Sequence, residues 1–157
     1  MRLSAGIVFL AVSLASGCNA SFNILAPGIP GSGVAKEETR LVEAFHALEA
    51  GNALQVVVLV NPGAKPSLKI SGDDNLVPLV ESVIRDGTLI LRLKDNSSIS
   101  PKLPLLAEVV AGELDGVAAS GAASVKVKGG AMVITFSASA SGAAQVTVEG
   151  VESSQAV

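Results

Sequence analysis

The stretch ASGAASVKVKG at residues 119–129 returns 21 residues later as ASGAAQVTVEG at residues 140–150. Eight of the eleven positions are identical, and the three that differ alternate with the shared valines and glycine. Such alternation is typical of a half-buried strand, because successive side chains of a strand point to opposite faces. The repeat therefore predicts a small-residue corner that feeds a short strand, used twice in a stacked β-architecture.

Two β-architectures fit this period. Three strands of about five residues joined by turns of about two make one coil of a three-sided β-solenoid, whereas two longer strands with their hairpins give the same length. In the solenoid, Val125 would lie beside Val146 in adjacent parallel strands, about 4.8 Å apart; in a meander an intervening strand would roughly double that spacing. The Ala-Ser-Gly-Ala-Ala corners favour the solenoid, because tight corners need residues that tolerate unusual backbone angles. A Gly/Ala/Ser linker is the weakest alternative, since linkers do not keep valines in period two.

The composition supports one all-β domain and disfavours several functions. Hydrophobic residues make up 49% of the 157 residues and charged residues 16%, so global disorder is not expected. Aromatic residues are only 3%, with no Trp or Tyr, which argues against aromatic platforms for sugars or nucleobases. The net charge of −3 and the lack of a basic cluster argue against nucleic-acid binding. We therefore predict a right-handed β-helix-like stack with an aliphatic core.

The N-terminus reads as a targeting segment. Arg2 precedes an apolar run over residues 3–14, which is too short to span a bilayer permanently. Residues 14–18 (LASGC) resemble a bacterial lipobox, although Ala15 stands where that pattern most often has Leu. The resemblance implies a signal peptide over 1–17 and lipid attachment at Cys18, the sole cysteine, so that membrane lipid is an expected partner. A plain secretory signal cut near Ala20 is the alternative.

Domain boundaries follow from the composition. Residues 18–35 are rich in Gly, Pro and Ser and are predicted to form a flexible tether, followed by a β domain over 36–152 and a tail over 153–157. Asn19 is not the acidic residue that retains lipoproteins at the inner membrane of enteric bacteria, which favours the outer membrane. Residues 36–50 stay open between helix and strand, because Leu41, Phe45 and Leu48 have helical spacing but the stretch also fits an opening strand.

Several strands and turns are explicit further along the chain. The apolar run at 54–60 and the alternating residues 67–71 predict strands, and the Gly-Asp-Asp-Asn stretch at 72–75 predicts a turn whose side chains bond their own backbone. Asp86-Gly87 between the strand-like residues 80–85 and 88–93 is a strong hairpin signal. A further strand is predicted at 132–137.

The chain offers no convincing catalytic or metal-binding set. His46 is the only histidine and has no nearby partner of the kind that catalysis needs, so we interpret it as a surface or packing residue. A calcium loop at the paired aspartates would need further oxygen ligands at regular spacing, which are missing. The remaining carboxylates are scattered and mostly at turns, and no cofactor or metal is expected: Asp73, Asp74, Asp86, Glu108, Glu113 and Asp115.

Several short motifs follow one another in a fixed order: VEAF at 42–45, ISGDDNLVP at 70–78, DGTLI at 86–90 and the Ser-Gly corners at 120–121 and 141–142. Together they resemble a bacterial family, the autotransporter adhesin head domain called the GIN domain. The resemblance covers about residues 39–150 and implies a β-solenoid-like fold, export to the envelope and an adhesive or scaffolding role, with no catalytic residues. Longer members continue with further strands, so the last coil is expected to lack a cap and to be covered by another chain.

These observations predict a non-enzymatic, membrane-anchored lipoprotein of the cell envelope whose β domain acts as an adhesin or scaffold. Envelope proteins or surface glycans are the expected partners. One alternative is a polysaccharide-acting β-helix enzyme, which would need clustered carboxylates. The other is a structural protein that forms homo-oligomers through open strand edges.

Overall fold

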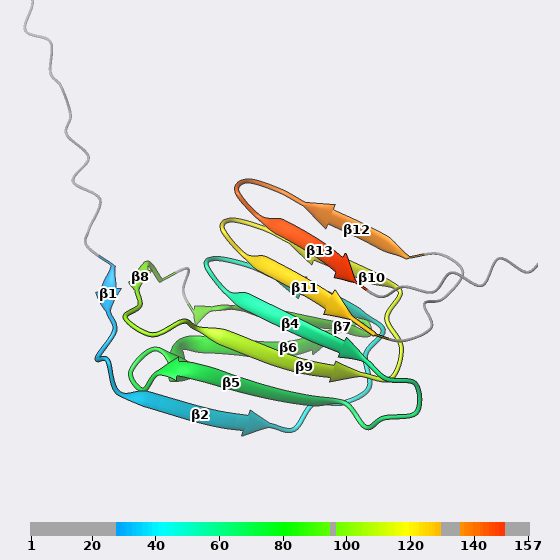
Figure 1. Ribbon diagram of the computed structural model, residues 1–157, viewed down its shortest axis with the longest axis horizontal. Coiled ribbons are helices and arrows are strands. Elements are labelled where there is room, and N and C mark those ends of the chain that lie inside the picture. Colours follow the sequence, from blue (N-terminus) through cyan, green and yellow to red (C-terminus); the bar gives the residue numbers. More distant parts are fainter. Residues whose placement is uncertain (1–27, 95–96, 130–135, 150–157) are drawn as a thin grey trace, which may run out of the picture.

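The computed structural model describes residues 28–94, 97–129 and 136–149, which form strands joined by turns (Figure 1). This part of the chain holds no α-helix and one short 3-10 helix, so the predicted all-β class is confirmed. The elements are β1 Ile29–Pro30, β2 Ala35–Arg40, β3 Ala47–Ala50, β4 Gln55–Val60, β5 Ser67–Asp73, η1 Val77–Leu79, β6 Val80–Arg85, β7 Thr88–Leu93, β8 Ile99–Ser100, β9 Leu106–Ala111, β10 Gly116–Ala119, β11 Ser124–Lys128, β12 Ser137–Ala140 and β13 Gln145–Glu149.

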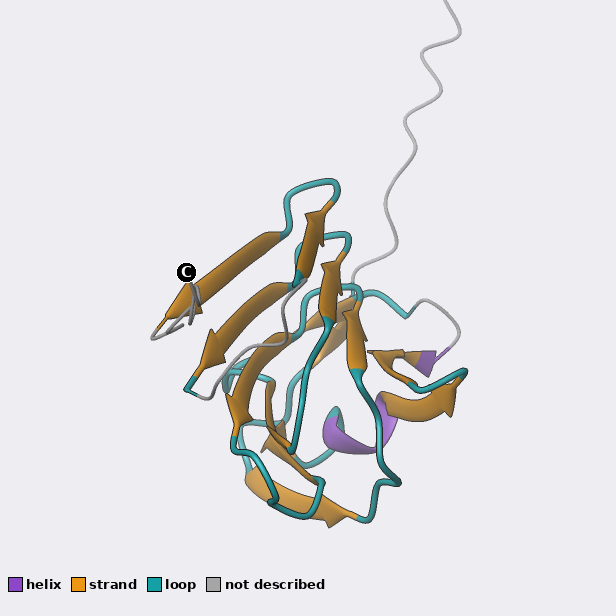
Figure 2. Ribbon diagram, turned by 90° about the vertical axis from the view of Figure 1, so that its right-hand side faces the viewer, coloured by secondary structure: helices purple, strands orange, loops and turns teal. Residues whose placement is uncertain are grey.

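The strands form two main sheets that enclose one aliphatic core (Figure 2). One sheet has the order β12-β10-β3-β7-β6, the other has the order β13-β11-β4-β9-β5-β2, and β1 with β8 makes a small separate pair. Alternate residues of the central strands are buried: Val56, Val58 and Val60 of β4 point into the core while Leu59 is exposed. Period-two alternation thus fixes which side chains fill the space between the sheets.

The sequence repeat occupies adjacent parallel strands, as predicted. β11 pairs with β13 in parallel, with Val125 beside Val146 and Val127 beside Val148. In the other sheet β10 lies between β3 and β12, again in parallel. The meander alternative is therefore wrong for this part of the chain, because no strand intervenes between the two copies.

The lower strands do not continue this coiling. β5 pairs antiparallel with both β2 and β9, and β6 pairs antiparallel with β7. The order of the parallel coils also departs from chain order, since β3 and β4 lie between the β7/β9 level and the β10/β11 level. One continuous right-handed coil, as expected from the sequence, does not describe this half of the domain, because successive coils pair in parallel whereas β2, β5 and β6 run antiparallel to their neighbours.

The corners between the two sheets explain the small residues of the repeat. Asn52, Gly121 and Gly142 occupy successive corners with positive φ angles of 63°, 69° and 73°. The N–H of Ala122 donates to the Asn52 carbonyl at 2.7 Å, and the N–H of Ala143 donates to the Gly121 carbonyl at 2.8 Å. Each corner thus repeats a left-handed residue and hydrogen-bonds to the corner below, which favours glycine.

The predicted hairpin is confirmed. β6 and β7 pair antiparallel from Val80 opposite Leu93 to Arg85 opposite Thr88. Asp86 and Gly87 have φ angles of 48° and 74°, so both turn residues are left-handed. This is the backbone geometry that Asp-Gly favours between two strands.

The segment left open between helix and strand is extended. β2 ends at Arg40 and β3 begins at Ala47. Leu41 is fully exposed while Phe45 and Leu48 are buried, so the three residues with helical spacing do not share one buried face. Pairing of these strands with β5, β7 and β10 outweighs the local helical pattern.

The N-terminal part of the domain begins earlier than the boundary at residue 36. Ile29 and Pro30 pair in parallel with Ile99 and Ser100, so residues from Gly28 onward, which the sequence analysis assigns to the tether, contact the folded domain. The predicted signal peptide, Cys18 and the tail lie outside the described residues, as does most of the strand predicted at 132–137. None of the described residues forms a helix with the length and hydrophobicity to cross a bilayer.

Candidate functional site

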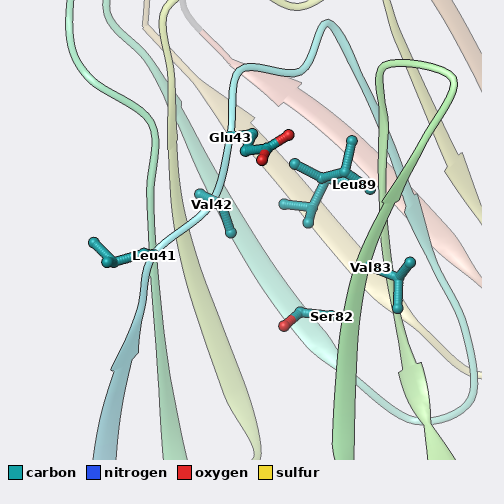
Figure 3. Close-up of a pocket in the computed structure, with 7 residues that line it drawn as sticks. Leu41, Val42, Glu43, Ser82, Val83 and Leu89 are labelled. Atoms are coloured by element: carbon teal, nitrogen blue, oxygen red, sulfur yellow. The ribbon is translucent and has the colours of Figure 1, made fainter.

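A surface hollow of about 350 Å³ lies between the segment after β2 and the hairpin (Figure 3). Figure 3 shows Leu41 and Val42 on opposite sides of that segment, with Val42 on the side of Ser82 and Leu89. The exposed surface of the hollow is more polar than apolar, although five of the seven lining residues have apolar side chains: Leu41, Val42, Glu43, Ser82, Val83, Ile84 and Leu89. The hollow therefore lacks the mostly apolar lining that is typical of a small-molecule site.

Arg40 connects the edges of the two sheets next to this hollow. Its Nη1 donates to the Val80 carbonyl at 2.6 Å and to Ser82 Oγ at 3.2 Å, and its Nε donates to Glu38 Oε1 at 2.7 Å. The hydrogen bond from Arg40, together with its positive charge, lowers the pKa of the Glu38 carboxyl. Arg40 therefore holds β2 against β6 and closes the lower end of the core.

Asp73 is a buried carboxylate that joins distant segments of the chain. It is fully buried and accepts hydrogen bonds from the N–H groups of Gly33 at 2.6 Å, Lys102 at 2.9 Å and Leu103 at 3.0 Å. Burial alone raises the pKa of Asp73, but the three N–H donors and the charge of Lys102 more than offset this and hold it below its ordinary value. A turn is present, but it lies later than the predicted range 72–75: Gly72 and Asp73 belong to β5, and the turn covers residues 74–76. The Asp73 side chain binds remote backbone instead of its own.

The next two turn residues hold the same N-terminal segment, residues 28–34, which we call the strap. Asp74 accepts from Ser32 Oγ, and Asn75 accepts from the Ser32 N–H while its side-chain amide donates to the Pro30 carbonyl. Gly31 leaves no room for a side chain, because a Cβ there would lie 2.3 Å from Asp73 Oδ2. Residues 30–34 of the strap are therefore fixed to the turn, whereas Ile29 pairs with β8.

The outward face of the six-stranded sheet carries a half-exposed apolar strip on β4 and β9, made of Val57, Leu59, Leu106 and Val110. Leu59 is 46% exposed. Ion pairs lie on both sides of the strip: Lys69 with Glu108 at 2.7 Å and Lys126 with Glu149 at 2.6 Å. This face offers a flat, mixed apolar and charged surface that suits contact with another surface better than enclosure of a small molecule.

The scattered carboxylates do not converge on a reaction centre. Asp86 lies in the hairpin turn, Glu108 faces Lys69 on the sheet, and Glu113 is exposed between β9 and β10. The backbone N–H of Asp115 donates a hydrogen bond to the His46 carbonyl, which joins the start of β10 to the start of β3. Across residues 28–94, 97–129 and 136–149, no group of three His, Cys, Asp or Glu residues could hold a metal ion.

His46 is exposed and its ring packs over the hairpin turn, which agrees with its interpretation from the sequence as a surface or packing residue. Its N–H donates to the Gly87 carbonyl at 2.9 Å. Its ring lies so close over the hairpin turn that a Cβ on Gly87 would be 2.1 Å from the His46 Cε1 atom. The side chain covers the turn.

Comparison with known proteins identifies the family. Residues 44–156 match the family described as "Putative auto-transporter adhesin, head GIN domain", so the chain belongs to this family of GIN-domain proteins. The resemblance drawn from the sequence motifs is thereby confirmed. Membership indicates a protein of the cell surface or envelope, in a family described as adhesins and not as enzymes. No curated protein matches the sequence.

Solved structures share the fold. A putative adhesin from Bacteroides fragilis is 21% identical with a TM-score of 0.70, covering 77% of this chain and 56% of that chain. A putative adhesin from Parabacteroides merdae is 21% identical with a TM-score of 0.56, covering 66% and 42%. A putative lipid binding protein from Parabacteroides distasonis is 18% identical with a TM-score of 0.57, covering 64% and 43%. The chain thus spans about half the length of these proteins.

Proposed function

We propose that the protein is a non-enzymatic lipoprotein of the bacterial envelope that presents its β domain as an adhesive or scaffolding module. The match to the GIN-domain family over residues 44–156 is the observation that carries this proposal. The lipobox-like residues 14–18 supply the expected anchor at Cys18, with palmitate or a similar fatty acid in the attached lipid and the outer membrane as the expected location. The parallel coils represent a short solenoid-like stack, and this is the form in which we expect the module to be displayed.

The apolar strip on β4 and β9 is the contact face that we propose for adhesion or scaffolding. Leu59 projects from it next to Val57 and Val110, and charged pairs border it. An envelope protein or a surface glycan would bury the apolar atoms and exchange hydrogen bonds with the border.

Anchoring is tested by metabolic labelling with a radioactive fatty acid, followed by membrane fractionation. The wild-type protein is expected to incorporate label and to sediment with the outer membrane. The Cys18→Ser variant is expected to lose both properties, and an Ala20→Ser variant serves as a matched control at the alternative cleavage site. Equal labelling of wild type and Cys18→Ser would contradict a lipid anchor at this residue.

Adhesion is tested by binding of the purified protein to bacterial cells, envelope extracts and glycan arrays. Leu59→Glu is expected to weaken binding at least about tenfold, because it places a charge in the strip. Thr39→Glu, at an exposed position of β2 two strands away from the strip, is the control. Absence of binding by the wild type, together with unchanged surface attachment of a deletion strain, would remove the proposal.

A further inference from the structure

The end of the stack formed by β12 and β13, which we call the open end, exposes side chains that point toward the core. Val125 and Val127 of β11 are completely buried, whereas their register partners on β13 are less covered: Val146 is half-buried and Val148 is 37% exposed. In the other sheet, Val117 is buried and its partner Ala138 is exposed. The last coil therefore carries core residues without a further coil over them in the described structure.

The backbone edge of the open end is also unpaired within the described residues. β12 and β13 each occupy the terminal position of their sheet. At the opposite edge, β2 carries the charged run Ala-Lys-Glu-Glu-Thr-Arg, which discourages pairing with another chain. β12 has the uncharged sequence Ser-Ala-Ser-Ala, and β13 has Glu149 as its one charged residue. The open end thus lacks the charges that protect the other edge.

The arrangement of the open end restricts which partner can cover it. It presents two strand edges, β12 from one sheet and β13 from the other, with the partly covered Val146 and Val148 on the core side. A partner that covers the whole open end must therefore present two strands at the separation of the two sheets. A second copy presents the same two edges at the same separation, so a twofold arrangement can pair both edges at once.

We propose that the open end binds the open end of a second copy of the chain, which extends both sheets across a twofold axis. β13 pairs antiparallel with its symmetry mate about Thr147, so that Val146 lies opposite Val148 of the second copy on the core side. On the outer side, Gln145 lies opposite Glu149, an amide opposite a carboxylate, which brings no like charges together. In the other sheet, β12 pairs with β12 of the second copy. The alanines of the two copies face each other on the core side, and the serines face each other on the outer side.

This inference rests on the proposed function in one respect: a dimer would present two copies of the apolar strip on β4 and β9 to a binding partner. Analytical ultracentrifugation of the full mature protein is expected to show a dimer. Val148→Lys, which places a charge on the core side of the new interface, is expected to raise the dissociation constant at least tenfold. Leu59→Lys, on the outer face of β4, is the matched control and is expected to leave the dimer intact while weakening adhesion. The two variants separate failure of one proposal from failure of the other.

Cross-linking tests the register independently of the stability of Val148→Lys. Thr147→Cys is expected to form an intermolecular disulfide under mild oxidation, because the residue lies on the axis, whereas Thr39→Cys on the opposite edge is not. A wild-type monomer at all concentrations, equal dimerisation of Val148→Lys, or equal cross-linking of the two cysteine variants would overturn the proposal. A monomer that dimerises only after removal of residues 150–157 would show that the chain covers its own edge, and would also overturn it.

Discussion

Gly121 lies directly beneath Gly142 at the same corner of successive coils, and the N–H that follows Gly142 donates to the Gly121 carbonyl at 2.8 Å. Both glycines have φ near +70°, at 69° and 73°. A Cβ on Gly142 would lie 3.0 Å from the Gly121 oxygen, so each corner requires glycine for two reasons, backbone angle and close approach. The period of 21 residues thus reflects the need to place this conformation at the same height in each coil.

Alanine substitutions at two glycines separate the cost of the left-handed backbone angle from the cost of close approach. Gly121→Ala is expected to destabilise the fold by about 2–3 kcal/mol, because it forces a left-handed alanine and places its Cβ 3.1 Å from the Asn52 carbonyl. Gly63→Ala is the matched control: φ is also positive, at 80°, but nothing lies within 4 Å, so about 1 kcal/mol is expected. Urea unfolding measures both, and equal costs would show that close approach is unimportant.

The paired valines of the repeat test burial at equivalent positions. Val125→Ala removes a completely buried side chain and is expected to cost about 2 kcal/mol of unfolding free energy. Val146→Ala makes the same change one coil further along, where the side chain is half-buried within one chain. In the Val148→Lys background, in which the dimer is weakened, less than about 1 kcal/mol is expected. In the dimer the second copy covers Val146, so its cost is expected to approach that of Val125→Ala.

Asp73 is expected to make stability depend on pH in the acid range. Its pKa is lower in the folded chain than its ordinary value of 3.8, so the folded state binds this proton less readily than the unfolded chain. The stabilisation is complete well above pH 3.8 and is lost as the pH falls from there through the lower folded pKa. The melting temperature of wild type should therefore fall in this window more steeply than that of Asp73→Asn.

The Asp73→Asn variant should also melt lower at neutral pH. An amide can accept from part of the donor set of Gly33, Lys102 and Leu103, but its NH₂ group opposes the remaining N–H. Asp74→Asn is the control, because its exposed side chain accepts a hydrogen bond from the Ser32 hydroxyl and an amide oxygen can do the same. Parallel pH profiles for wild type and Asp73→Asn would show that this carboxylate does not link the strap to stability.

Arg40 and Arg92 allow a comparison of two arginines in different settings. Arg40→Lys is expected to cost about 1–3 kcal/mol, because an ammonium cannot reproduce the fork that reaches Val80 and Ser82 while it also binds Glu38. Arg92→Lys affects a surface pair with Glu81 whose arginine side chain is 47% exposed, and less than about 1 kcal/mol is expected. Thermal unfolding measures both; equal shifts would indicate that Arg40 does not connect the sheets.

Much of the local structure could be predicted from the sequence because its causes are local. Asp86-Gly87 supplies two residues that adopt positive φ readily, and the antiparallel hairpin follows. The period of 21 residues places Val125 beside Val146, since identical coils stack in register. The all-β class follows from the alternation of apolar and polar residues along the predicted strands.

The remaining features depend on contacts between distant residues, which leave no signal in a single sequence. Asp73 binds Gly33, 40 residues earlier, and Leu103, 30 residues later. Nothing in the Gly- and Pro-rich residues 28–34 predicts that they contact a buried carboxylate. Leu41 and Phe45 have helical spacing, yet strand pairing places one in solvent and the other in the core. The hollow and the apolar strip likewise arise only when separate strands meet.

The position of β3 and β4 in the middle of the stack has a consequence for the order of folding. Their lower neighbours, β7 and β9, and their upper neighbours, β10 and β11, are all made later than residues 47–60. The first-made coil therefore cannot nucleate alone, and long loops must close before it gains either neighbour, which slows folding. Ribosomal synthesis and acquisition of the native structure are consequently separated in time, and refolding should proceed in one late step that requires nearly the whole domain.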